Sequence, residues 1–435
     1  MFPRFPRSWL RRLALPALAG LLTAAAVGCA NTDSWVEHTA PRGWPAQYAN
    51  AANSSYSEVP GARSLELKWT RSVKGGLFTQ AALGETGYVA LNAQTPAGCS
   101  LMVWEYGDNG RQRWCNRLMQ GGDFSGPLFD VFDNLYVGEP GTMLSFPPTQ
   151  WVRWRQPVIG MPLTPRFVGD GRLLVVTHLG QIEILDAQNG RVIGPPVDLV
   201  PGVNPTDSRR GLPDCRPARA LCPIAAAPAF AADPGMLALT LWPPDAPAPV
   251  VSGLKYNRDK ITVTPMWQSD AVEGGPLGSP VFSADGNTVY VNGRTGRLWA
   301  LYAGNGKPKW SVDLGYQPEG PPAVTPGGSV ISGGGTDAKL VAIRDFGERG
   351  EVVWRREDLS PLTTSSLAGA DVAYTVTRAD PDKMTLVVFD PSDGHTINSY
   401  PLPDATGQPV GVSVAADRTV VTATTDGQVY GFSPG

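Results

Sequence analysis

A repeat of about 40 residues is the feature that most limits what this chain can fold into. Its clearest copy, "RLWALYAGNGKPKW", combines an apolar strand with a small residue, Ala300, a turn glycine, Gly306, and Trp310 four residues later. The tryptophan position recurs every 40–45 residues, with one interval of 73, at Trp69, Trp114, Trp154, Trp267, Trp310 and Trp354. Gly194 and Asn398 occupy it in two further copies. Eight copies with this period indicate a closed repeat architecture.

Each copy opens with a strand, an Asp/Gly turn and a valine-rich strand, as in "GSPVFSADGNTVYVNG". Together with the two strands around the tryptophan, this gives four antiparallel strands per copy, the content of a propeller blade. The 50 glycines, 42 prolines and only 17% charged residues suit many short strands joined by turns. The sequence therefore predicts an all-β, eight-bladed β-propeller over residues 63–435. Each tryptophan is expected to wedge against the neighbouring blade.

The two ends of the repeat region predict how the ring closes. The chain stops in "DGQVYGFSPG", after the third strand of its last copy, whereas "LELKWTRSV" around Trp69 supplies an isolated fourth strand near the start. Pairing of these segments in one blade leaves no open edge. The long interval predicts a Pro-rich insertion at about residues 195–228 within one blade. Residues 29–62 are predicted to be a tether, part of which packs on the propeller.

The first 28 residues have the pattern of an export signal. Four arginines precede an apolar run of 16 residues, shorter than the ~20 of a spanning helix, and "AVGC" ends in Cys29. This sequence resembles a bacterial lipobox, which predicts acylation of Cys29 and attachment to the membrane through lipid. An uncleaved membrane anchor is the alternative. The signal leaves open both the export route, Sec or twin-arginine, and the membrane that receives the anchor.

The remaining cysteines form two pairs that are close in sequence. Cys99 and Cys115 flank one predicted hairpin, and Cys215 and Cys222 bracket a short loop in the insertion. Two local disulfides, formed in an oxidising compartment, are the prediction. Zinc is the alternative, but no histidine lies near either pair and the spacings differ from those of zinc sites. We expect no metal site.

Charge and the other reactive residues restrict the functional classes. The formal net charge of −3 becomes −7 once the four signal arginines are removed, which does not favour nucleic-acid binding. The three histidines, at positions 38, 178 and 395, show no metal or triad spacing. The insertion contains a small basic cluster of Arg209, Arg210, Arg216 and Arg219. It is a candidate contact for anionic lipid or an acidic partner, and ordinary solvation is the alternative.

The pattern Ala300, Gly306 and Trp310 resembles the tryptophan-docking repeat of pyrroloquinoline-quinone-repeat propellers. The segment "GWPAQYANAANSSYSEVPG" is similar to the one that opens quinoprotein dehydrogenases, through Trp44, Pro45, Asn53, Tyr56 and Ser57. Those enzymes hold quinone and calcium beneath a disulfide of adjacent cysteines, which this chain lacks, and no residue matches their catalytic set. The architecture is closer to the non-catalytic lipoprotein branch of outer-membrane β-barrel assembly.

The sequence thus predicts an exported, lipid-anchored, non-catalytic propeller that binds another protein of the bacterial envelope. We expect it to be a monomer without a cofactor. One alternative is a quinoprotein-like oxidoreductase or binder of a small redox ligand. Another is a glycan-binding propeller, which a convergent aromatic-plus-carboxylate pocket at one mouth would favour.

Overall fold

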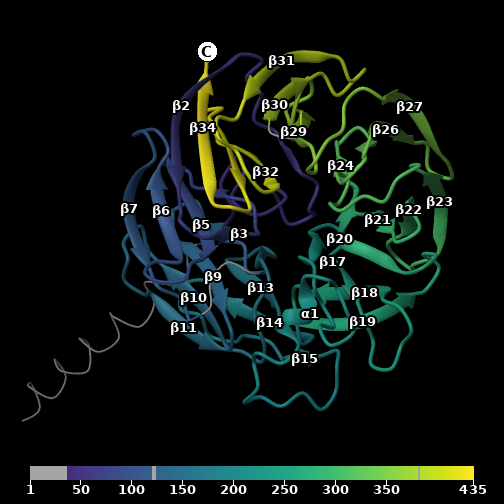
Figure 1. Cartoon of the computed structure of the whole chain (residues 1–435). Helices are drawn as coiled ribbons and strands as arrows, with labels where there is room; N and C mark the ends of the chain where they lie inside the picture. The colour runs from purple at the N-terminus through teal and green to yellow at the C-terminus, as the bar shows by residue number, and fades with distance from the viewer. Residues whose placement is uncertain (1–36, 120–123, 381–382) are drawn as a thin grey trace, which may run out of the picture. The chain divides into compact units, whose positions relative to one another are not determined.

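Eight small sheets follow one another around a common axis and form an eight-bladed propeller (Figure 1). The computed structural model describes residues 37–119, 124–380 and 383–435. The ring spans His38–Gly435 together with the segment that precedes its first strand, residues 38–62, which we call the lead-in. The predicted fold class is confirmed. No helix within these ranges has the length and apolar character needed to cross a membrane.

The blades are numbered along the chain, and the strands of each are given from the axis outward. Blade 1 consists of β3 (Gly76–Leu77) with β4 (Ala82–Leu83), β5 (Tyr88–Gln94), β6 (Leu101–Glu105) and β7 (Arg111–Asn116), and blade 2 of β8 (Leu128–Phe129), β9 (Leu135–Glu139), β10 (Thr142–Phe146) and β11 (Trp154–Pro157). Blade 3 consists of β12 (Arg166–Phe167), β13 (Arg172–Val176), β14 (Gln181–Asp186) and β15 (Val197–Asp198), and blade 4 of β16 (Ala229–Ala231), β17 (Met236–Leu241), β18 (Val250–Asn257) and β19 (Thr262–Ser269).

Blade 5 consists of β20 (Pro276–Phe282), β21 (Thr288–Gly293), β22 (Arg297–Tyr302) and β23 (Pro308–Asp313), and blade 6 of β24 (Ala323–Val324), β25 (Ser329–Ile331), β26 (Leu340–Asp345) and β27 (Gly350–Arg356). Blade 7 consists of β28 (Ser366–Ala368), β29 (Val372–Asp380), β30 (Lys383–Phe389) and β31 (Thr396–Pro401), and blade 8 of β32 (Pro409–Val414), β33 (Val420–Thr424), β34 (Gln428–Pro434) and β2 (Leu65–Ser72). A short strand, β1 (Tyr56–Ser57), adds parallel to β28, and the helix α1 spans Leu212–Cys215.

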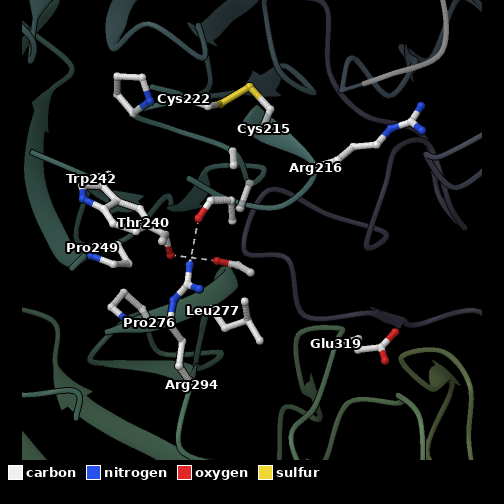
Figure 2. Close-up of a pocket in the computed structure, with 15 residues that line it drawn as sticks. Cys215, Arg216, Cys222, Thr240, Trp242, Pro249, Pro276, Leu277, Arg294 and Glu319 are labelled. Atoms are coloured by element: carbon white, nitrogen blue, oxygen red, sulfur yellow. Dashed lines mark hydrogen bonds between the residues drawn. A yellow bond between two sulfur atoms is a disulfide. The ribbon is translucent and has the colours of Figure 1, made fainter. Parts of the chain in front are cut away.

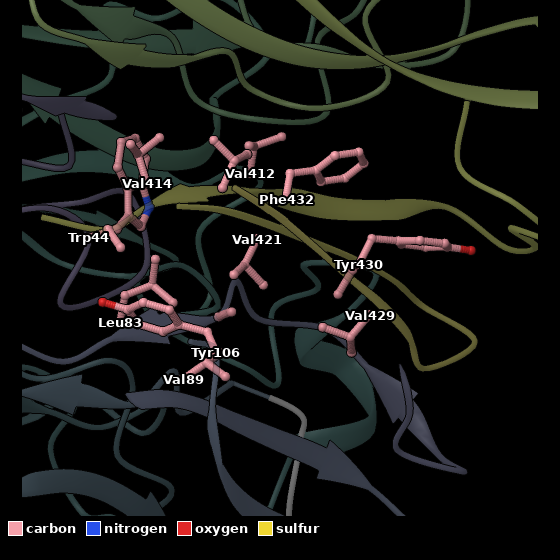
Figure 3. Packing of buried hydrophobic residues seen from close by; sticks show 14 of the residues in the cluster. Trp44, Leu83, Val89, Tyr106, Val412, Val414, Val421, Val429, Tyr430 and Phe432 are labelled. Carbon is pink, nitrogen blue, oxygen red and sulfur yellow. The ribbon is translucent and has the colours of Figure 1, made fainter. Parts of the chain in front are cut away.

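Blade 8 closes the ring as predicted. The purple strand β2 lies beside the yellow strand β34 in Figure 1, and the two pair antiparallel with Trp69 opposite Gly431. Inside this blade, Val412, Val414 and Phe432 pack in one apolar cluster that also contains Trp44 of the lead-in (Figure 3). Burial of this surface ties the first strand of the ring to the last three.

The docking tryptophans bridge consecutive blades. The indole of Trp69 stands against Gly110 of blade 1, and a Cβ on that glycine would come closer than 3.0 Å to the ring. The Trp69 Nε1–H donates to the carbonyl of Tyr106 at 2.9 Å. The same packing against a turn glycine of the next blade recurs at Trp154, Trp267, Trp310 and Trp354. The glycine therefore provides room for the ring, as well as the positive φ of 66° that its own turn requires at Gly110.

Trp114 shows what happens when the turn glycine is missing. The turn that follows β10 in the next blade contains Pro147 and Pro148 instead of glycine. Trp114 is still buried and its ring centroid lies 5.6 Å from that of Phe146, but within the described chain its Nε1–H has no acceptor. The docking position therefore tolerates loss of the hydrogen bond as long as the ring stays packed.

Two predicted boundaries need correction. The ring unit begins at His38, so residues 38–62 of the predicted tether at residues 29–62 are the part that packs on the propeller, and the propeller unit begins at residue 38 instead of 63. The sequence predicts the insertion at about residues 195–228 within one blade, but β15 at Val197–Asp198 completes blade 3 and β16 begins blade 4. The insertion therefore covers residues 199–228 and connects two blades. A two-residue strand leaves too little periodicity for the sequence to show it.

Candidate functional site

The two mouths of the ring differ. We call the mouth where the innermost strands begin the leading mouth, and the mouth where they end the trailing mouth. The lead-in crosses the trailing mouth, and six of its carbonyls accept hydrogen bonds at 2.7–3.0 Å from the innermost strands of six blades. The donors are the amides of Leu83, Phe129, Phe230, Phe282, Val324 and Leu367. Residues 43–57 therefore fill this mouth with backbone, and we call them the plug.

A polar cluster on the axis holds the plug. The side-chain Nδ2 of Asn53 donates to the carbonyls of Ala227, Pro228 and Pro280 at 3.0–3.2 Å. Arg166, fully buried on β12, donates to the side chain of Asn53 and, at 3.2 Å, to the carbonyl of Pro228. Burial lowers the pKa of Arg166 to about 9. The buried cation of Arg166 and the side chain of Asn53 therefore fix the plug to blades 3, 4 and 5.

His38, which precedes the plug in the chain, binds a carboxylate of blade 2. Its Nδ1 lies 2.6 Å from a carboxylate oxygen of Asp130, and its Nε2 contacts Gln188. Burial works against ionisation of Asp130, but hydrogen bonds from His38, Asn134 and Tyr136 outweigh it and hold the pKa of Asp130 below its usual value. The histidine thus anchors the chain where it enters the trailing mouth.

The insertion covers part of the leading mouth. His178, in the turn between β13 and β14, donates from Nε2 to the carbonyl of Arg210 at 2.8 Å and accepts from the Met161 amide at Nδ1. Burial lowers the pKa of His178, which keeps the imidazole neutral for this pairing. Within the insertion the Cys215–Cys222 disulfide joins Cα atoms 5.0 Å apart. This disulfide and the Cys99–Cys115 disulfide beside β6 and β7 confirm both predicted pairs.

Between the insertion and blades 4, 5 and 6 lies a pocket of about 160 Å³, which we call the leading-mouth pocket (Figure 2). The disulfide and Pro223 form the wall from the insertion, and Trp242 and Pro249 form the wall from blade 4. Its polar side chains include Arg216, Arg294, Thr240 and Glu319.

Arg294 is held by the insertion and by blade 4. Its Nη2 donates to the carbonyl of Ala218 in the insertion at 3.1 Å, and its guanidinium carbon lies 5.5 Å from the Trp242 ring centroid. Glu319 is held from outside the pocket, because its Oε1 accepts from the amide and hydroxyl of Thr336 at 3.2 and 3.0 Å. The pocket therefore presents a fixed cation, an aromatic ring and a carboxylate at one mouth.

The four arginines of the predicted basic cluster differ in their contacts. Arg216 lies on the rim of the leading-mouth pocket, where its guanidinium stacks 3.4 Å from the centroid of the Phe78 ring. Arg219 lies 3.9 Å from a carboxylate oxygen of Asp214, and Arg209 and Arg210 are exposed on the insertion. Only Arg216 lines the pocket.

Trp242, Arg294 and Glu319 escaped the sequence interpretation. Of these three residues, Trp242 alone could have been singled out from the sequence, because it is a tryptophan outside the docking position of its repeat. Cys29 and residues 1–28 lie outside the described residues. Among the residues that the structure describes, no group of three histidine, cysteine, aspartate or glutamate side chains is arranged to hold a metal ion.

Comparison with known proteins supports the repeat assignment. A family model described as outer membrane protein assembly factor BamB matches residues 259–433. Protein Rv3035 from Mycobacterium tuberculosis (strain ATCC 25618 / H37Rv) is 60% identical over 411 residues, which cover 94% of this chain and 100% of that protein.

Two solved structures share the architecture. BamB from Moraxella catarrhalis matches with a TM-score of 0.57 at 18% identity, over 85% of this chain and 100% of its own. Quinohemoprotein alcohol dehydrogenase from Comamonas testosteroni matches with a TM-score of 0.62 at 13% identity, over 91% of this chain and 81% of its own. At such identities the likeness shows the propeller fold alone.

Proposed function

This chain belongs to the family of Protein Rv3035 and is built as a pyrroloquinoline-quinone-type repeat propeller, and from that premise we propose that it is a non-catalytic scaffold of the bacterial envelope. In this proposal the chain is exported, acylated at Cys29 and held at a membrane by lipid, where the ring binds another envelope protein. The two disulfides support an oxidising compartment outside the cytoplasm.

One observation carries the proposal: the plug occupies the trailing mouth with the chain's own backbone. The amide groups that face the axis there donate to plug carbonyls, and Arg166 donates to Asn53 and Pro228. A propeller enzyme needs such converging polar groups for its ligand. Here they stabilise the ring instead, which supports a binding scaffold over a catalyst at this mouth.

The outer surface offers side chains suited to a protein partner. Trp151, in the turn between β10 and β11, is 73% exposed, and Met119, just after β7, is 64% exposed. The Asn116 side chain donates to the carbonyl of Gln150 at 2.6 Å, so the Trp151 turn lies beside the end of β7. Tryptophan and methionine are enriched in the centres of protein interfaces. We define Met119 and Trp151 as the proposed contact surface.

Site-specific crosslinking in the native envelope tests this surface. A photoreactive residue at position 151 of the full-length protein should give a discrete protein adduct, whereas the same residue at Phe346, an aromatic that is 53% exposed on blade 6, should not. Equal labelling from both positions, or none from 151, would contradict the proposal.

The quinoprotein alternative has its own test. Detergent-solubilised full-length protein is titrated with pyrroloquinoline quinone in the presence of calcium. We expect no saturable binding. Stoichiometric, saturable binding would replace the scaffold proposal with a redox function.

A further inference from the structure

We propose that the leading-mouth pocket is a binding site for a small ligand that carries a carboxylate group, with Arg294 as the residue that holds the carboxylate. This inference does not depend on the scaffold function, because it concerns a different mouth of the ring and a small molecule. It rests on the state of Arg294, on the shape of the pocket and on how its walls are fixed.

Arg294 is positioned but has unused donors. Guanidinium has five N–H groups. Within the described residues one of them, on Nη2, donates to the carbonyl of Ala218, while the Nε–H is buried without any acceptor. Nη1 also has no acceptor among the described residues, so its two N–H groups are the donors that a ligand in the pocket would use. The Trp242 ring beside the guanidinium limits its freedom to turn towards water.

The charge of Arg294 points in the same direction. Within the described chain no carboxylate lies at ion-pair distance from Arg294, and its one partner is a neutral carbonyl. Glu319 lines the same pocket, but Figure 2 shows it apart from Arg294, and its Oε1 is bonded to Thr336. A carboxylate on the ligand would supply both an acceptor and the opposite charge, and charge-assisted pairs of this kind are among the strongest hydrogen bonds.

The volume and walls limit the rest of the ligand. At about 160 Å³ the pocket is smaller than the ~300–1,000 Å³ of sites for drug-sized molecules. Pro249, Pro276 and Leu277 offer apolar faces, and Arg216 and Glu319 offer polar groups at the rim. A compact body next to the carboxylate fits these limits. Two sources share that chemistry: a carboxylated sugar ring and the C-terminal residue of a peptide.

The insertion forms a fixed wall of this pocket. The Trp242 amide donates to the Pro223 carbonyl at 2.8 Å, and the Cys215–Cys222 disulfide holds the loop that carries Ala218. The partner of Arg294 is therefore placed by the disulfide-closed loop.

Titration of the full-length protein in detergent tests the proposal. The probes are D-glucuronic acid and N-acetyl-alanyl-alanine, each compared with its uncharged counterpart, glucose and the dipeptide amide. Calorimetry gives the affinity, and the Nε–H signal of Arg294 in ¹⁵N-arginine-labelled protein gives the location. We expect saturable binding of at least one carboxylate, a shift of the Arg294 signal, and no binding of its counterpart. Whichever carboxylate binds identifies the source.

Substitution provides the matched control. Arg294→Gln should weaken binding by about tenfold or more, because it removes a charge-assisted pair. Arg297→Gln should leave binding unchanged, since Arg297 lies on β22 and donates to Ser311. If Arg294→Gln does not fold, the affinity of Arg294→Lys and the shift of the wild-type Nε–H signal still test whether Arg294 holds the carboxylate. The proposal is overturned if neither carboxylate binds better than its counterpart, or if Arg294→Gln binds like the wild type.

Discussion

Replacement of Trp69 by alanine tests ring closure directly. The Trp69 side chain is only 6% exposed, and an indole buries roughly 150–250 Å². At about 25 cal/mol per Å² this corresponds to about 4–6 kcal/mol, close to the ~3–5 kcal/mol that Trp→Ala changes usually cost. The lost hydrogen bond to the Tyr106 carbonyl adds about 1 kcal/mol. Adding this ~1 kcal/mol to the ~3–5 kcal/mol of Trp→Ala changes, we expect the free energy of unfolding to fall by about 4–6 kcal/mol.

The assay combines calorimetry with hydrogen exchange. For a ring of about 400 residues, an unfolding entropy of ~2.1 cal/mol/K per residue converts that loss into a decrease in Tm of about 5–7 °C. The amides of β34 that pair with β2 should exchange faster, because Trp69 holds β2 in blade 8. Trp310→Ala removes an equivalent ring from blade 5 and should lower Tm without changing exchange at β34.

The reference variant is Trp151→Ala, which removes an exposed indole and should change stability by no more than about 0.5 kcal/mol. A Tm for Trp69→Ala equal to that of Trp151→Ala would refute the reasoning. Unchanged exchange at β34 would do so as well, because Trp69 would then not secure the closing strand.

Three further outcomes are expected. Asn53→Ala should lower the free energy of unfolding by about 3 kcal/mol in urea titration, since it deletes three donated hydrogen bonds and the acceptor for Arg166. Burial raises the pKa of Glu183 from 4.5 to about 7, so wild-type stability should fall as the pH rises through that window, and Glu183→Gln should have the higher Tm at pH 8 but not at pH 4. Cys29→Ser should move the protein from the detergent to the aqueous phase in a phase-separation assay, and no movement would argue against acylation.

The docking repeat was predictable because each contact uses residues at fixed offsets in the chain. Trp310 lies opposite Ala300 across one hairpin, and Trp267 packs on Gly306 of the next repeat. Such offsets repeat with the blades, so the period alone indicates the packing. The lead-in has no period, because its carbonyls meet one blade after another in an irregular conformation. Its incorporation from His38 onward was for that reason only partly foreseen.

The order of residues by itself determined the number of blades and the docking tryptophans, because these contacts lie within or between consecutive repeats. It also determined the closure between Trp69 and the last strands, because the last repeat lacks the strand that the segment around Trp69 supplies. Only the tertiary structure decided that residues 43–57 fill one mouth and that Trp242, Arg294 and Glu319 meet at the other. These groups come from the lead-in, from blades 4 and 5 and from the connection between blades 5 and 6. Their proximity results from the curvature of the ring, which places turns that are distant in sequence around one axis.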